Sequence, residues 1–68
     1  MRKYIVFESE DESKTVEVNI TFIIEVETEI TKFNKTGKMG DNERAISLIE
    51  KCPFDISKLK HISILFKS

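Results

Sequence analysis

Apolar and polar residues alternate over the middle of the chain. Between residues 15 and 26 every odd position is polar except Ile23, and every even position is apolar: Val16, Val18, Ile20, Phe22, Ile24 and Val26. A period of two is typical of a β-strand with one buried face and one solvated face. The pattern therefore predicts a strand here, with its even positions in the core.

The residues that follow keep a β-forming composition as far as Asn34. A single straight strand over residues 15–34 would be about 65 Å long, whereas a domain of this size is roughly 25 Å across. The chain must therefore bend, bulge, turn back or leave the domain. We expect one long bent strand with a bulge between Ile30 and Phe33, where the alternation slips. The alternative is two strands with a break near Thr28.

Two shorter strands are predicted near the ends of the chain. Residues 4–9 begin with a run of β-formers, and the polar residues 10–14 are typical of a loop. Residues 61–67 return to a period of two, with Ile62, Ile64 and Phe66 on one face. Residues 54–61 before this strand are expected to be irregular or 3₁₀ chain, capped by Asp55 or Ser57.

One helix is predicted between the long strand and the last one. Residues 35–40 contain both glycines and are typical of a loop. Asp41 then suits a helix N-cap, and Glu43 suits the first helical turn. Apolar residues follow at helical spacing until Pro53, which ends the helix at or before Cys52.

The order β, long bent β, α, β predicts an α+β fold in one domain over residues 1–68. We expect a small antiparallel sheet of three or four strands with one helix packed on one face. Its core would hold the even positions of the long strand together with Phe7, Ile62, Ile64, Phe66 and either Ile5 or Val6. This core is thin and leaves Ile23, Phe33 and Leu65 uncovered. A homodimer or higher homo-oligomer, paired along the long strand, is therefore predicted.

Composition excludes several classes of protein. Apolar residues make up 40% of the chain and charged residues 34%, which is typical of a folded domain. The net charge of −1 gives no general attraction to nucleic acid or to acidic membranes. A single cysteine cannot form an internal disulfide. The first apolar stretch ends at Glu8, too early for a signal peptide, and no run is long enough to cross a membrane. A cytoplasmic protein without membrane contact is expected.

Residue usage also bears on the source. Ile occurs ten times and Lys nine times, whereas Ala occurs once and Gln is missing. AT-rich codons encode the common residues, which favours a low-GC genome. A short chain from such a genome is often a virus or phage accessory protein.

Candidate catalytic chemistry is sparse. Cys52 is the only thiol and His61 the only imidazole. Cys52 lies on the apolar side of the expected helix, where an inert buried thiol is the usual outcome. Four zinc ligands cannot be assembled from these two residues, and the acidic loop lacks the spacing of a calcium site. We therefore expect no enzyme activity, no metal and no cofactor.

The segment around Gly37 supports an alternative function. Lys35 and Lys38 flank a glycine loop that precedes the expected helix, whose N-terminal N–H groups would attract an anion. The segment is not a phosphate-binding loop of the nucleotide-hydrolase type, because Lys32 and Met39 replace two required residues. Nucleotide or nucleic-acid binding through this loop and the basic second half of the chain remains the alternative.

Charges are segregated along the chain. Residues 1–29 have a net charge of −5 and residues 30–68 a net charge of +4. On the long strand, Glu17, Glu25, Glu27 and Glu29 would form one acidic row with about 6.6 Å between successive odd positions. Such a row is either an ordinary solvated face or a surface that docks on a basic partner. We predict a non-enzymatic protein-interaction module that inhibits or regulates a host protein by edge-strand pairing and this acidic face.

Overall fold

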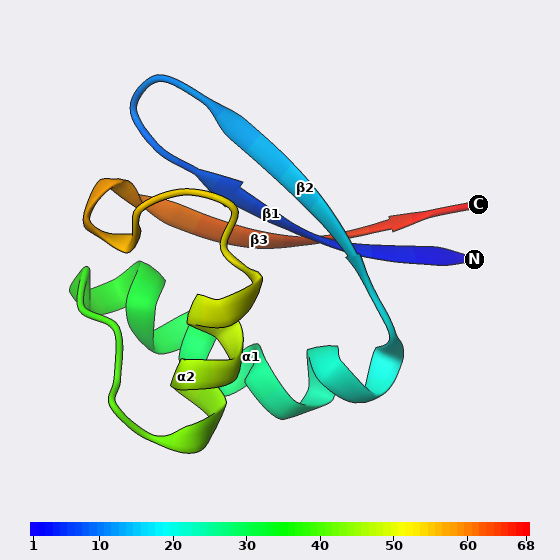
Figure 1. Cartoon of the computed structure of the whole chain (residues 1–68). Coiled ribbons are helices and arrows are strands. Elements are labelled where there is room, and N and C mark those ends of the chain that lie inside the picture. The colour runs from blue at the N-terminus through cyan, green and yellow to red at the C-terminus, as the bar shows by residue number, and fades with distance from the viewer.

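The computed structural model describes all residues from Met1 to Ser68. Its elements in chain order are β1 (Arg2–Glu8), β2 (Ser13–Val18), α1 (Ile20–Thr36), α2 (Glu43–Lys51), the 3₁₀ turn η1 (Ile56–Lys58) and β3 (His61–Lys67). The three strands form one antiparallel sheet in the order β2-β1-β3. Both helices lie on the same side of this sheet (Figure 1). The predicted α+β fold with a small antiparallel sheet and helical cover on one face is confirmed.

The predicted long bent strand is wrong. Strand β2 ends at Val18, and the residues from Ile20 onward form the 17-residue helix α1. Asn19 separates the two elements and is the N-cap, because its side-chain oxygen accepts a hydrogen bond from the Phe22 N–H at 2.8 Å. At the other end Gly37 has a φ of 76° and donates its N–H to Phe33. That left-handed conformation is the usual way to end a helix and favours glycine.

Packing explains why a helix forms where the residues alternate. The residues that α1 buries have helical spacing: Ile23, Val26, Glu29, Ile30 and Phe33. Ile23 and Phe33, the two apolar residues that break the period of two, are each only 4% exposed. Two even positions, Ile20 and Ile24, are 45% and 66% exposed instead. The helix therefore buries a different apolar set from the one that a strand would bury.

The helix also resolves the conflict between chain length and domain size. Seventeen helical residues extend only about 26 Å, and the molecule measures 31 × 27 × 19 Å with a radius of gyration of 11.1 Å. The residues after Asn19 therefore fit inside the domain without a bend or a bulge.

The core lies between the sheet and the two helices. It contains Ile5, Phe7 and Ile62 from the sheet, Val26, Ile30 and Phe33 from α1, Leu48 from α2, and Leu59 from the loop before β3. Of the core residues expected from the sequence, Phe66 is 49% exposed and Ile64 is only partly buried. The inner face of the sheet is thus well covered around Phe7 and open near Phe66.

The second half of the chain follows the prediction closely. A helix precedes Pro53, a 3₁₀ turn capped by Asp55 follows it, and the last strand is His61–Lys67. The N-cap of α2 is Asn42 and not Asp41, with its side chain accepting from the Ala45 N–H. The expectation of one helix is wrong only because α1 replaces most of the long strand.

Candidate protein-interaction site

The outer edge of β3 presents free backbone groups beside apolar side chains. In an antiparallel sheet, successive residues point their N–H and C=O groups alternately toward and away from the neighbouring strand. The Asn34 amide binds both groups of Ile62: Nδ2 donates to the carbonyl oxygen at 2.7 Å, and Oδ1 accepts from the N–H at 2.9 Å. The backbone groups of Ile62 therefore point away from β1. By the same alternation, so do those of Ile64 and Phe66.

No strand covers this edge, because β3 is the outermost strand on its side of the sheet. The hydrogen bonds that lie outside the regular helix and sheet ladders do not involve Ile64 or Phe66. Each of these two residues therefore offers one N–H donor and one C=O acceptor to a further strand. We call the outward backbone groups of Ile64 and Phe66 the free β3 edge.

Helix α1 borders the free β3 edge. Glu27, Thr31 and Ile64 line one shallow hollow on this side of the molecule. Ile24 precedes Glu27 by about one turn and so lies on the same side of α1. Ile24 is 66% exposed and Phe66 is 49% exposed. A strand added at the free β3 edge would thus find apolar side chains together with the carboxylate of Glu27.

The opposite edge of the sheet has a different character. The residues of β2 that point their backbone groups outward are Ser13, Thr15 and Glu17, as follows from the register with β1. All three are exposed and polar. Polar and charged side chains are a common protection of an edge strand against association. The two edges of the sheet therefore differ in the residues whose backbone groups point outward, which are polar on β2 and apolar on β3.

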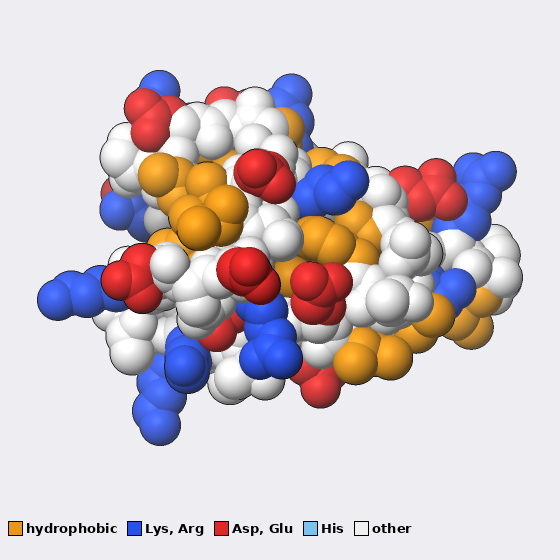
Figure 2. All heavy atoms as spheres, turned by 60° about the horizontal axis from the view of Figure 1, so that its bottom comes forward, with side chains coloured by type: hydrophobic (Ala, Val, Ile, Leu, Met, Phe, Trp, Pro, Cys, Tyr) orange, Lys and Arg blue, Asp and Glu red, His pale blue; other side chains and the backbone are white.

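The four glutamates of the predicted acidic row do not form a row. Glu17 is on β2, whereas Glu25, Glu27 and Glu29 are on α1. Glu25 and Glu27 are exposed but project about 200° apart around the helix. Figure 2 shows acidic and basic side chains intermixed on the helical side of the molecule. The row depended on an extended backbone, so no continuous acidic face exists.

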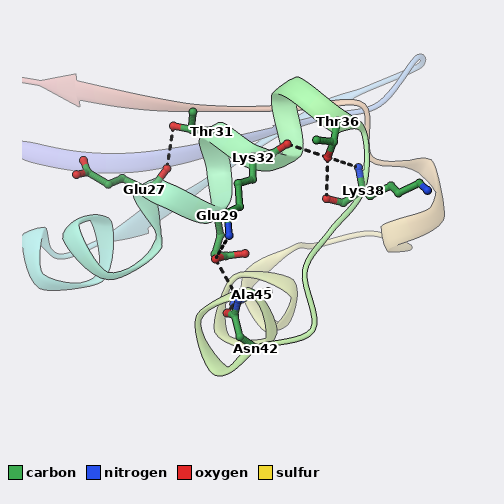
Figure 3. A network of polar contacts seen from close by, with 8 residues as sticks. All are labelled: Glu27, Glu29, Thr31, Lys32, Thr36, Lys38, Asn42 and Ala45. Carbon is green, nitrogen blue, oxygen red and sulfur yellow. Dashed lines mark hydrogen bonds and ion pairs between the residues drawn. The ribbon is translucent and has the colours of Figure 1, made fainter.

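Glu29 has a structural position, with only 4% of its surface exposed. Its Oε2 atom accepts a hydrogen bond from Asn42 Nδ2 at 3.1 Å and lies 3.9 Å from Lys32 Nζ (Figure 3). Asn42 at the same time caps α2 through the Ala45 N–H. Glu29 thereby connects α1 to the start of α2. Gly40 lies against this carboxylate, because a Cβ placed there would be 2.8 Å from Glu29 Oε1.

Lys35 and Lys38 lie at the end of α1 and just after it, and residues 39–42 separate them from α2. Lys35 is in the last turn of α1, and Lys38 follows the Gly37 cap. Thr36 Oγ1 accepts from the Lys38 N–H at 3.1 Å, which connects Lys38 to the last residue of α1 (Figure 3). The start of α2 is occupied by the Asn42 cap, with Glu43 in the first turn. The Asn42 cap already uses an N–H group of this helix end, and the negative charge of Glu43 disfavours an anion there.

Cys52 and His61 each have a different neighbour. The Cys52 thiol donates to the Phe54 carbonyl at 3.3 Å. His61 Nδ1 lies 3.4 Å from Glu8 Oε1 on the exposed surface. No group of three or more His, Cys, Asp or Glu side chains is arranged to hold a metal ion. A polar hollow elsewhere on the surface is lined by residues of both charge signs, among them Asp11 and Lys58.

Sequence reasoning alone misses the free β3 edge. It assigns Ile64 and Phe66 to the core and gives Asn34 no role beyond the end of a strand. The apolar alternation of β3 is visible in the sequence, but whether a strand is central or at an edge depends on strand order. A contact between Asn34 and β3 can be predicted only once residues 20–36 are recognised as a helix.

Comparison with protein-family models, with curated proteins and with solved structures gives no match for this chain. Neither helix has the length and apolar character needed to cross a membrane. The free β3 edge and the side chains around it therefore carry the functional argument.

Proposed function

We propose that this chain is a non-enzymatic protein-interaction module that binds an extended segment of a partner as an added strand at the free β3 edge. One observation carries the proposal: the backbone groups of Ile64 and Phe66 have no partner in the chain, although they lie beside apolar side chains. Main-chain hydrogen bonds supply affinity in this mode of recognition, and alternate side chains supply specificity.

The surroundings of the edge define the chemistry of the partner. Side chains on one face of the added strand would lie toward α1, near Ile24 and Glu27. A segment with alternating apolar residues and one basic residue suits these two neighbours. Of the four predicted partner-binding glutamates, Glu27 alone borders the hollow that contains Ile64. The residue usage favours a viral or phage source, in which case the added strand would belong to a host protein that this module inhibits or regulates.

A peptide titration tests the proposal. The probe is a soluble heptapeptide that alternates Val with Thr and contains one Lys, added to the ¹⁵N-labelled chain. We expect the backbone amide shifts of Ile64 and Phe66 to move and their hydrogen exchange to slow, while those of Thr15 and Glu17 on the β2 edge stay unchanged. The substitution Ile64→Pro removes one outward N–H without removing a bond to β1, and it should abolish binding.

The matched control is Thr15→Pro, which removes an outward N–H from the β2 edge. This variant should bind the peptide as the natural chain does. Shifts confined to β2, or binding that survives Ile64→Pro in a folded chain, would exclude the free β3 edge as the binding site.

A further inference from the structure

We propose that, when no partner segment is bound, a second copy of this chain occupies the free β3 edge, by antiparallel pairing of β3 with β3 around a twofold axis at Leu65. This inference rests on the proposed function, since it names the strand that is added there. Three observations support it: the number of free backbone groups, the position of Asn34 and the order of the side chains in β3.

The free backbone groups match a twofold pairing. With the axis at Leu65, Ile64 of one copy faces Phe66 of the other, and the reverse holds by symmetry. Each such pair exchanges two hydrogen bonds, since the facing residues both point their groups outward. The pairing therefore uses the N–H and C=O groups of Ile64 and Phe66 in both copies. It requires nothing from Ile62, whose groups are already bound by Asn34.

Asn34 also excludes a neighbouring register. An axis at Ile64 would place Phe66 of the second copy opposite Ile62, where the Asn34 side chain lies. An axis at Phe66 would place Leu65 opposite Lys67. An axis at Leu65 keeps Leu65 opposite Leu65 and places only Ser68, which follows the end of β3, opposite Ile62.

The side chains of β3 are complementary to themselves in this register. On the open face of the sheet, half-buried Leu65 meets Leu65 of the second copy, and Ser63 meets Lys67. On the helical face, Ile64 meets Phe66, which is an aromatic and β-branched pair of the kind that stabilises sheets. The two Lys67 side chains are about 13 Å apart along the strand. No like charges face each other.

The dimer would also cover apolar surface that the single chain leaves exposed near Phe66. A chain of 68 residues buries only about 60% of the surface that its unfolded form exposes, less than a larger domain does, and oligomerisation is a common remedy. The two sheets would join into six strands with both sets of helices on the same face. The only remaining edges would be the polar β2 edges, which are the protected ones.

Sedimentation equilibrium of the full chain from micromolar to millimolar concentration tests the proposal. We expect a monomer–dimer equilibrium. Leu65→Lys places two ammonium groups opposite each other at the axis and removes the Leu65 contact, so the dimer dissociation constant should rise about tenfold or more. Thr15→Lys is the control, since Thr15 lies on the same face of the sheet but at the β2 edge, and it should leave the constant unchanged. A chain that remains monomeric throughout overturns the proposal.

Disulfide cross-linking reads the register directly, in a Cys52→Ser background. Leu65→Cys should oxidise to a covalent dimer, because facing residues of this kind have Cα atoms about 4.5 Å apart. Ser63→Cys and Lys67→Cys should each fail alone but cross-link to one another when mixed. Cross-linking of Ser63→Cys with itself, or of Thr15→Cys at the β2 edge, would overturn the register.

The peptide titration separates the two possible failures. If the chain is monomeric but the heptapeptide still protects the Ile64 and Phe66 amides, the edge binds strands and the second copy is not the occupant. If the chain is monomeric and the peptide does not bind at β3, both proposals fail.

Discussion

Asn34 in α1 substitutes for a strand at the edge of β3, since its amide binds the carbonyl and the N–H of Ile62 at 2.7 and 2.9 Å. A neighbouring strand would make the same pair of bonds at this position. The outward backbone groups of β3 are therefore bonded at Ile62 and free at Ile64. One side chain thus joins the end of α1 to the sheet and limits where another chain can pair.

We expect Asn34→Ala to lower the free energy of unfolding by about 1–2 kcal/mol, because two hydrogen bonds of about 1 kcal/mol each are lost. Urea denaturation measures this change. The Ile62 amide should also exchange faster with solvent. In Asn34→Asp the carboxylate still accepts from the Ile62 N–H but cannot donate to its carbonyl, so amide protection should persist while stability falls. Unchanged exchange at Ile62 in Asn34→Ala would show that this contact is not formed in solution.

Asn19 should contribute as the N-cap of α1. We expect Asn19→Ala to cost about 1 kcal/mol of unfolding free energy, because the Phe22 N–H loses its acceptor. Asn19→Asp keeps an acceptor at the cap and is the control, with stability close to that of the natural chain. Equal losses in both variants would argue against capping as the cause.

Gly40 and Glu29 should be energetically coupled. Gly40→Ala places a Cβ 2.8 Å from Glu29 Oε1, so the carboxylate must move away from Asn42, at a cost of roughly 1–2 kcal/mol. In a Glu29→Ala background this contact is gone, and Gly40→Ala should be neutral or slightly stabilising. A double-mutant cycle by urea denaturation measures the coupling. Additive effects would contradict the close approach.

Asp55 should titrate below its ordinary value. The Ser57 N–H and hydroxyl both donate to Asp55 Oδ1 at 3.0 Å, and these hydrogen bonds lower the pKa of the carboxyl from 3.8. Because the pKa is lower in the folded chain, the stabilisation is fully present above the unfolded value and is lost as the pH falls through the folded value. Carboxyl ¹³C shifts measure the titration. Ser57→Ala removes the hydroxyl and keeps the N–H, so it should move the pKa only part of the way back toward 3.8, and an unchanged midpoint would exclude the Ser57 hydroxyl as a cause.

An isolated peptide of residues 13–37 should show little helix by circular dichroism in water. The α1 segment contains many β-branched residues and no acidic residue in its first turn. Short helices of this kind derive most of their stability from packing. A strongly helical peptide would show that the segment folds by local preference alone.

The sequence by itself determined the elements whose apolar pattern is compatible with only one kind of secondary structure. Residues 61–67 alternate, and Pro53 must end a helix, so β3 and the end of α2 follow from the chain. Asp55 could be named as a cap because its side chain acts on its own neighbours. Pro53 and Asp55 act on residues close in sequence, so their effects can be predicted without a fold. Strand β3 pairs with the distant β1, but its alternation has no competing helical pattern.

Tertiary structure decided the state of residues 20–34 and the location of the candidate site. This segment has a period of two through Val26 and a helical period through Ile23, Val26, Ile30 and Phe33, so either apolar set could be buried. The helix places its set against Phe7, Leu48 and Ile62 from other elements, and it fits the width of the domain, as an extended chain of that length does not. The free β3 edge likewise depends on strand order and on a contact between residues 34 and 62. Both are properties of the assembled fold, because they depend on residues far apart in the chain.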